Sequence, residues 1–228
     1  MKTTLIIGAS SGIGRALAEN LINNNQSVIS LSRNKPDLDN IEHYTYDILS
    51  NDQLPQISQQ IEGIVYCPGS INLKPFRTLK QQDFITELEL NVLGAIKILQ
   101  AYSSNLVQSK NASVVFFSTV AVQTGMPFHS SVAVSKGALE GLTRALAAEF
   151  APKIRVNCIA PSLTQTPLAG KLINTPEKLE AGANRHPLKR IGTTSDIANA
   201  AEFLLSDKAS WVTGQVIHID GGMSSLKI

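Results

Sequence analysis

Short apolar runs alternate with longer helical patterns along the whole chain, and this alternation restricts the fold more than any other feature. The runs that we interpret as strands are rich in Val, Ile, Leu, Tyr and Phe, and they cover residues 5–7, 28–31, 44–46, 64–67, 114–117, 154–159 and 216–219. The longer patterns predict helices from Gly12, over about 83–107, over about 132–150 and over 197–205. Strands separated by helices of this length need crossover connections, so we predict a parallel sheet with helices on both faces.

The composition fits a single α/β domain of this kind. The chain has 228 residues, of which 43% are hydrophobic, and this is enough to bury a sizeable core without disulfides or bound metal. Cys67 and Cys158 lie far apart and form no Cys-x-x-Cys pair, so we expect neither a disulfide framework nor a zinc site. The net charge is +2 and the basic residues are scattered, which argues against a nucleic-acid surface.

Two further expectations concern location and domain layout. The apolar run near the N-terminus is too short for a signal peptide or a membrane span, so we expect a cytoplasmic protein without a membrane partner. No repeat, low-complexity tract or linker divides the chain, and we expect one domain over residues 1–228. The segment of about 162–191 is irregular in pattern and rich in proline and polar residues, and we expect it to form a functional lid.

A glycine-rich turn follows the first expected strand. Residues 8–14 read Gly-Ala-Ser-Ser-Gly-Ile-Gly, and the next helix begins within them. Glycines at such a turn let the backbone approach a pyrophosphate closely, and the helix N-terminus offers unpaired N–H groups. The spacing is G-x-x-x-G-x-G rather than G-x-G-x-x-G, and an ordinary glycine-rich turn is the alternative. In this strand–turn–helix context we predict a dinucleotide-binding turn. Its candidate contacts are Gly8, Ser10, Ser11, Gly12, Ile13 and Gly14.

The end of the second expected strand bears on which dinucleotide is bound. Proteins that prefer NAD place a carboxylate there, about 20 residues beyond the turn, to bind the ribose 2′-hydroxyl. Here Leu31-Ser32-Arg33-Asn34 contains no carboxylate, and Arg33 could pair with a 2′-phosphate through charge-assisted hydrogen bonds. The alternative is that Arg33 is a solvated loop residue. We predict NADP (as NADPH) as the cofactor, with NAD the less favoured choice.

Motifs spread over nearly the whole chain resemble those of the short-chain dehydrogenase/reductase family. The glycine turn matches the family's G-x-x-x-G-I-G, and Asp47-Ile48 is similar to its adenine-contacting pair. Pro68-Gly69 lies where the family usually has Asn-Asn-Ala-Gly, so the side chains there depart from the pattern. Residues 161–166 resemble the segment beside the nicotinamide, where Thr166 would meet the carboxamide. The tail segments 187–190, 213–215 and 220–222 are similar to those of 3-oxoacyl-(acyl-carrier-protein) reductases.

The resemblance implies a Rossmann-like, doubly wound parallel sheet with strand order 3-2-1-4-5-6-7. The cofactor would then lie at the carboxyl ends of the strands. Outside the glycine turn, the expected cofactor contacts are Arg33, Asp47, Ile48, Pro68, Gly69, Asn91, Lys136, Pro161, Thr164 and Thr166.

The family's catalytic pattern is only partly present. The family uses Tyr-x-x-x-Lys together with an earlier serine and a helix asparagine. Lys136 is in place, but the tyrosine position holds Val132, and the serine position holds Thr119, which keeps a hydroxyl. Asn91 matches the asparagine. The resemblance implies that the lysine binds the ribose and lowers the tyrosine pKa while the tyrosine protonates the substrate oxygen, and valine has no proton to give.

One candidate for the missing proton donor is His129. If a helix starts near this residue, His129, Val132 and Lys136 lie along one face, with His129 one turn before the vacant position. A histidine has an ordinary pKa of about 6.5, which suits acid–base work. A loop histidine without a role is the alternative, and a water held by Lys136 is the other candidate donor.

Two functions stay open on this basis. The first is an NADP-dependent oxidoreductase that interconverts a small or acyl-linked carbonyl and an alcohol with a divergent active site. The second is a catalytically silent dinucleotide-binding or subunit-type protein on the same fold. A decaying site should lose Asn91, Thr119 and Lys136 together, so their joint presence favours the enzyme. The helix from Gly137 carries small and apolar residues on more than one face, and the family usually pairs this helix between subunits. We therefore expect a homotetramer, or at least a homodimer.

Overall fold

Seven parallel strands form one sheet in the computed structural model, which describes residues 2–106, 109 and 111–227. The strands are β1 (Thr3–Ile7), β2 (Ser27–Ser32), β3 (Ile41–Thr45), β4 (Gly63–Tyr66), β5 (Ala112–Phe117), β6 (Ile154–Pro161) and β7 (Val216–Ile219). Their order is β3-β2-β1-β4-β5-β6-β7, with every neighbouring pair parallel. The predicted doubly wound sheet and its strand order are confirmed.

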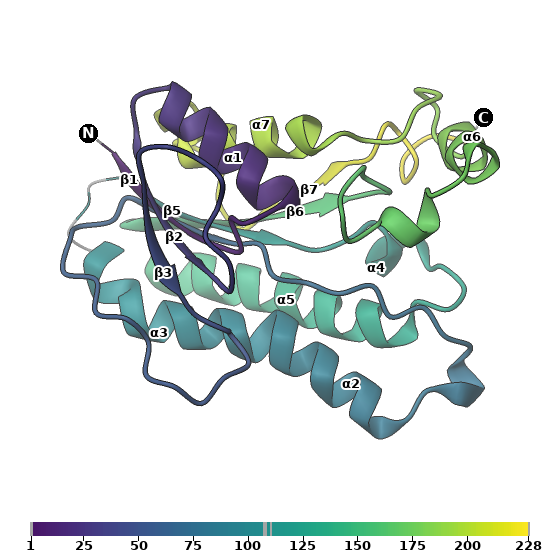
Figure 1. The fold of residues 1–228 in the computed structure, drawn as a ribbon, viewed down its shortest axis with the longest axis horizontal. Coiled ribbons are helices and arrows are strands. Elements are labelled where there is room, and N and C mark those ends of the chain that lie inside the picture. The colour runs from purple at the N-terminus through teal and green to yellow at the C-terminus, as the bar shows by residue number, and fades with distance from the viewer. Residues whose placement is uncertain (1, 107–108, 110, 228) are drawn as a thin grey trace.

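Helices cover both faces of this sheet (Figure 1). They are α1 (Gly12–Asn23), α2 (Gln81–Leu88), α3 (Gly94–Leu106), α4 (Ala121–Thr124), α5 (Ser130–Phe150), α6 (Pro176–Asn184) and α7 (Thr194–Leu205). Short 3₁₀ turns cover Phe76–Thr78, Gly170–Leu172 and Asp207–Ala209. In Figure 1, α1 and α7 lie above the sheet, and α2, α3 and α5 lie below it. None of the helices in the described ranges is long and apolar enough to cross a membrane.

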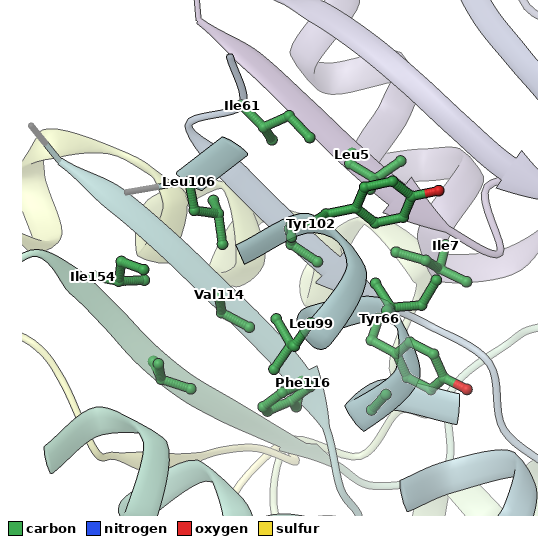
Figure 2. Close-up of a cluster of buried hydrophobic side chains, with 14 of the residues drawn as sticks. Leu5, Ile7, Ile61, Tyr66, Leu99, Tyr102, Leu106, Val114, Phe116 and Ile154 are labelled. Atoms are coloured by element: carbon green, nitrogen blue, oxygen red, sulfur yellow. The ribbon is translucent and has the colours of Figure 1, made fainter. Parts of the chain in front are cut away.

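The core has two layers because successive side chains of a strand point to opposite faces of the sheet. In β1, Ile6 belongs to the layer beneath α1 and α7, whereas Leu5 and Ile7 belong to the layer that α3 and α5 cover. Figure 2 shows part of the second layer, where Leu99 of α3 lies close to Tyr66 and Phe116. Both faces of the central strands are therefore buried, which explains why their sequences are continuous apolar runs rather than alternating ones.

The predicted elements are present, and the ends that can be compared differ from the prediction by at most three residues. The starts of the third strand and of the last helix shift most, by three residues each, to Ile41 and Thr194. The long helix predicted over 83–107 begins at Gln81, because Asp83 accepts a hydrogen bond from the Lys80 N–H at 2.8 Å and caps the helix start. Its last predicted residue, Val107, lies outside the described residues.

The segment 162–191 is less irregular than predicted, because it contains α6. The helix begins after Thr175, whose hydroxyl accepts from the Lys178 N–H at 3.3 Å, and Pro176 occupies the first helical position. Both are standard start signals for a helix. The prolines, which suggested a loop, mark this helix start and the turns around it.

Candidate functional site

Two adjoining cavities lie at the carboxyl ends of the strands, and they share Ile13, Cys67, Gly69, Thr166 and Leu168. We call the first the glycine groove; it has a volume of about 410 Å³ and lies over the ends of β1, β2 and β4. We call the second the lysine pocket; it has a volume of about 470 Å³ and lies over the ends of β5 and β6. This edge of a parallel sheet is where ligands bind in doubly wound folds.

The glycine groove is built around the turn between β1 and α1. Gly8 has a φ of +85° and donates its N–H to the Leu31 carbonyl at 2.9 Å, which ties the turn to the end of β2. A Cβ on Gly14 would clash with the Gly8 carbonyl oxygen, so the first turn of α1 can approach β1 only with glycine there. The Ser11 side chain makes no capping hydrogen bond to α1. The N-terminus of α1 is therefore suited to an anionic ligand.

Most of the predicted cofactor residues meet in these two cavities. Those that line the glycine groove are Gly8, Ser10, Ser11, Gly12, Ile13, Gly14, Arg33, Asp47, Ile48, Pro68, Gly69 and Thr166. Lys136, Pro161 and Thr164 line the lysine pocket instead, and Asn91 lines neither cavity. Residues from six separate stretches of the chain thus converge at one edge of the sheet.

Arg33 lies just beyond β2 at the rim of the glycine groove. Its side chain is exposed and takes part in none of the ion pairs found among the described residues. Asp47, on the neighbouring rim, accepts a hydrogen bond from the Leu49 N–H at 3.0 Å. A guanidinium in this position is free to meet a phosphate.

Lys136 carries the buried charge of the lysine pocket. Its Nζ donates to the Phe117 carbonyl oxygen at 2.8 Å, at the end of β5. Burial lowers the pKa of Lys136 to about 8, while the nearby Glu87 carboxylate acts in the opposite direction. The ammonium is thus retained at neutral pH in a place that disfavours charge.

Asn91 lies directly behind this lysine, in a π-helical turn over Glu89–Leu93 that joins α2 to α3. Its Nδ2 donates to the Glu87 carbonyl and carboxylate, both at 2.9 Å, but its buried Oδ1 has no partner among the described residues. A Cβ built on Gly69 would lie 3.4 Å from Nζ of Lys136 and 3.5 Å from Oδ1 of Asn91. The amide and the ammonium therefore meet beside Gly69, where the two cavities join.

Thr119, Val132 and His129 all line the lysine pocket with Lys136. Val132 is buried and lies one helical turn before the lysine on α5. His129 is the residue immediately before α5, as the predicted helix start requires, and its Nδ1 lies 2.7 Å from the Pro127 carbonyl oxygen. The hydroxyl of Thr119 accepts a hydrogen bond from the Ala121 N–H at 3.3 Å.

Three polar residues in and behind the pocket were not among the predicted site residues. Glu87 is 3% exposed and accepts a hydrogen bond from the Ser70 hydroxyl at 2.6 Å. Ser162 and His186 are hydrogen-bonded across 24 residues of sequence. No short-range spacing could have revealed contacts made between separate elements.

The two cysteine side chains stay in the thiol form. Burial raises the pKa of both Cys67 and Cys158 to about 12, so both thiols stay protonated at neutral pH. No group of three or more His, Cys, Asp or Glu side chains suited to a metal ion is found in the described part of the chain.

Comparison with known proteins relates the whole chain to a set of reductases. Residues 8–224 match a family model described as "Enoyl-(Acyl carrier protein) reductase". The chain is 31% identical to the 3-oxoacyl-[acyl-carrier-protein] reductase of Thermotoga maritima, and the match covers 97% of each protein.

Solved structures give the same result. The ligand-free aldohexose dehydrogenase of Thermoplasma acidophilum is 28% identical, with a TM-score of 0.92 over 99% of this chain and 95% of that one. The structure of ElxO with NADP bound is 27% identical, with a TM-score of 0.88 over 99% of each chain. These similarities extend over the glycine groove, the lysine pocket and the segment between them.

Proposed function

Since the chain belongs to the short-chain dehydrogenase/reductase family, we propose that it is an NADP-dependent oxidoreductase that interconverts a carbonyl and an alcohol. The observation that carries the proposal is the buried ammonium of Lys136 at the junction of the glycine groove and the lysine pocket. Burying this charge disfavours folding, so its presence at the junction favours a role in binding the dinucleotide and the substrate oxygen.

The residues present fit a dinucleotide. The glycine turn and the free start of α1 provide a cradle for its phosphates, and the groove continues into the pocket past Gly69. Lys136 has three N–H donors, of which the Phe117 carbonyl takes one. The remaining donors at this junction match the hydroxyl groups of a ribose.

Arg33 supports the choice of NADP. It provides a positive charge at the rim of the groove, and no carboxylate occupies residues 31–34. A solved relative, ElxO, binds NADP according to its description. We expect Arg33 to bind the 2′-phosphate through charge-assisted hydrogen bonds.

When bound, the nicotinamide supplies a hydride to the carbonyl carbon of the substrate. Thr119 then donates a hydrogen bond to the carbonyl oxygen, and the Lys136 ammonium stabilises the negative charge that develops on it. Asn91 and Glu87 hold the lysine from behind. Val132, at the family's tyrosine position, has no proton to give, so the proton must come from elsewhere in the pocket.

The pocket suits a small or acyl-linked carbonyl compound. Its wall is largely apolar, with Met126, Leu163 and Leu172 among the lining residues, and Lys178 and Arg185 add positive charge on the lid side. An apolar cavity with a few polar groups at one end would hold an acyl chain and orient its carbonyl toward Thr119.

Calorimetric titration with NADPH and NADH, followed by turnover assays, tests the proposal. The substrates would be a 3-oxobutanoyl thioester, a ketose and an aldohexose, with each cofactor in turn. We expect tighter binding of NADPH and measurable reduction of at least one carbonyl. Tight NADPH binding with no turnover on any of them would support the silent dinucleotide-binding protein instead.

We also propose that the protein assembles into a homotetramer or homodimer through α5. Val134, Ala138, Gly141 and Ala145 form an exposed stripe along this helix, and Val134 is 51% exposed. Small side chains allow two helices to approach closely. Light scattering at micromolar concentration should show an oligomer, and a monomer would contradict this part of the proposal.

A further inference from the structure

The side chains of His186 and Ser162 form a pair that opens on the lysine pocket. His186 is the second residue after α6 and is 2% exposed. Its Nε2 lies 2.8 Å from Oγ of Ser162, and its Nδ1 lies 2.8 Å from the Gly182 carbonyl oxygen. The Ser162 Oγ lies 3.0 Å from Sδ of Met223. Gly182, His186, Ser162 and Met223 thus form one chain of three polar contacts.

The direction of these contacts follows from the protons available. A carbonyl oxygen and a thioether sulfur can only accept, so the three contacts need three protons from the two side chains between them. The serine hydroxyl provides one, and a neutral imidazole provides one more. All three contacts are satisfied only when the imidazole carries a proton on both nitrogens. In that state Nε2–H donates to Ser162, and the Ser162 hydroxyl points its proton at Met223.

His186 lies just beyond the C-terminal end of α6. Gly182 lies in the last turn of this nine-residue helix, where carbonyl groups lack partners within the helix. A donor at a helix C-terminus can satisfy one of these carbonyl groups. The Nδ1–H bond to the Gly182 carbonyl is therefore one that a protonated imidazole makes well.

Ser162 and His186 also form part of the wall between two cavities. Both line the lysine pocket, and both line a third, smaller cavity of about 180 Å³ bordered by Arg190, Asp196 and Asp220. On the pocket side, the Val120 N–H donates to the Pro161 carbonyl at 3.1 Å. Thr119 precedes Val120 and Ser162 follows Pro161, so both are sequence neighbours of this hydrogen-bonded pair.

Four cations and two carboxylates surround the pair. Lys136 of α5, Lys178 of α6 and Arg185 lie on the pocket side. In the third cavity, Arg190 and Asp196 pair with each other at 2.6 Å. The Asp220 carboxylate, in the C-terminal segment beside α6 (Figure 1), accepts the Gly222 and Ser224 N–H groups at 2.9 and 2.8 Å.

We propose that Ser162 and His186 supply the proton that the site lacks in the absence of the family's tyrosine, an inference that rests on the proposed reductase function. The substrate oxygen takes the place of the Met223 sulfur as acceptor of the Ser162 hydroxyl proton. As hydride from the reduced nicotinamide reaches the carbonyl carbon, the C–O π electrons become a lone pair on oxygen. This oxygen takes the proton from Ser162, and Ser162 takes the proton from Nε2 of His186. His186 is left neutral, and its Nδ1–H still donates to the Gly182 carbonyl oxygen. Water in the third cavity then returns a proton to Nε2.

The first test is independent of turnover. Long-range ¹H–¹⁵N NMR of the histidine-labelled protein reports which ring nitrogens carry protons, with His186→Gln used to assign the signals. We expect both ring nitrogens of His186 to carry a proton at the pH of the turnover assay, as the three contacts require. An Nε2 that lacks a proton at this pH would overturn the relay.

The second test is kinetic and uses NADPH with a 3-oxobutanoyl thioester or whichever carbonyl of the panel is reduced. Ser162→Ala and His186→Gln should each lower kcat by about 10²-fold or more with a small change in KM, and Ser162→Thr should retain most of the rate. Ser118→Ala is the matched control, because Ser118 lines the same pocket but donates to Glu140 at 2.6 Å. This control should keep the wild-type rate.

The outcomes separate the relay from the reductase function. If the wild type reduces a carbonyl and Ser162→Ala keeps its rate, the relay is wrong and the proposed function stands. If the wild type binds NADPH but reduces none of the panel, the proposed function fails and the relay fails with it. Loss of rate in Ser162→Ala and His186→Gln but not in Ser118→Ala supports both.

Discussion

The glycine groove and the lysine pocket adjoin at one edge of the sheet, but the groove is built mainly from backbone and small residues and the pocket from polar side chains. The groove presents backbone and small residues, with the Gly8–Gly14 turn and the start of α1 at its centre. The pocket presents buried polar side chains, each held by hydrogen bonds to another element. A backbone site is fixed by the fold, whereas a side-chain site can change its chemistry through a few substitutions.

Under the proposed function, this difference would allow one region to keep its ligand while the other changes its mechanism. Replacing a groove glycine disturbs the packing of α1 on β1, since a Cβ on Gly14 meets the Gly8 carbonyl. Val132 lies on the wall of a cavity of about 470 Å³, so we expect a change of its side chain to disturb α5 and the sheet less. We therefore expect that a proton donor can act from more than one position in the pocket.

The largest expected effect is a rescue between two positions in the pocket. Ser162→Ala should lower the rate of carbonyl reduction by about 10²–10⁴-fold, the usual contribution of a positioned general acid. Adding Val132→Tyr to this variant should recover most of the loss, because a tyrosine there supplies a hydroxyl one turn before Lys136. Steady-state kinetics of the single and double variants measure the coupling.

Val132→Phe in the same background separates the hydroxyl from the ring. It fills the same space but has no proton to donate, so it should recover nothing. Equal recovery by Tyr and Phe would show that pocket shape, rather than a proton, limits the reaction.

The buried Lys136 side chain predicts that the free energy of unfolding depends on pH. The folded-state pKa of about 8 lies below the ordinary lysine pKa of 10.5, so the unfolded state binds more protons between these values and stability rises with pH across this window. Lys136→Met removes the effect. Relative to this variant, the wild type should gain about 2–3 kcal/mol of unfolding free energy between pH 7 and pH 10.

Urea unfolding of both proteins at the two pH values checks this. The lost bond to the Phe117 carbonyl affects the variant equally at both, so it cancels in the difference. A pH-independent difference between the two proteins would mean that the lysine is not held in a desolvated site.

Arg33 tests the groove rather than the pocket. Arg33→Ala should weaken NADPH binding by about 10- to 150-fold, the value of a charge-assisted hydrogen bond, and should leave NADH binding unchanged. Arg15→Ala is the control, since Arg15 is an exposed arginine on α1 whose Nη2 donates to the Asp37 carbonyl at 3.3 Å. Titration calorimetry gives both affinities, and equal affinities of the wild type for NADPH and NADH would contradict the choice of NADP.

The same contrast governs what could be read from the sequence. The groove and the parallel sheet were predictable, because glycine spacing and apolar runs are local patterns that the backbone obeys directly, whereas the strand order came from the family resemblance. The α6 helix was not, because its start at Thr175-Pro176 looks like a loop when the prolines are read alone. The link between Ser162 and His186 was not either, since it depends on how α6 is placed against the end of β6.

The smallest expected effect concerns His129, which the helix pattern marked as a candidate donor. His129 lines the lysine pocket, but its Nδ1 lies against the Pro127 carbonyl within its own loop, and no contact ties its ring to Thr119 or Lys136 in the described structure. With Ser162 and His186 supplying the proton, His129→Ala should change kcat by no more than about twofold, or roughly 0.4 kcal/mol in the barrier. If His129 were the donor, the variant would lose its turnover, and the wild-type rate would fall as the pH rises through a histidine pKa in a way that His186→Gln leaves intact. Comparing pH–rate profiles of the two histidine variants therefore decides which imidazole serves the pocket. A profile that survives His186→Gln and disappears in His129→Ala would move the proton source from the sheet edge to the start of α5.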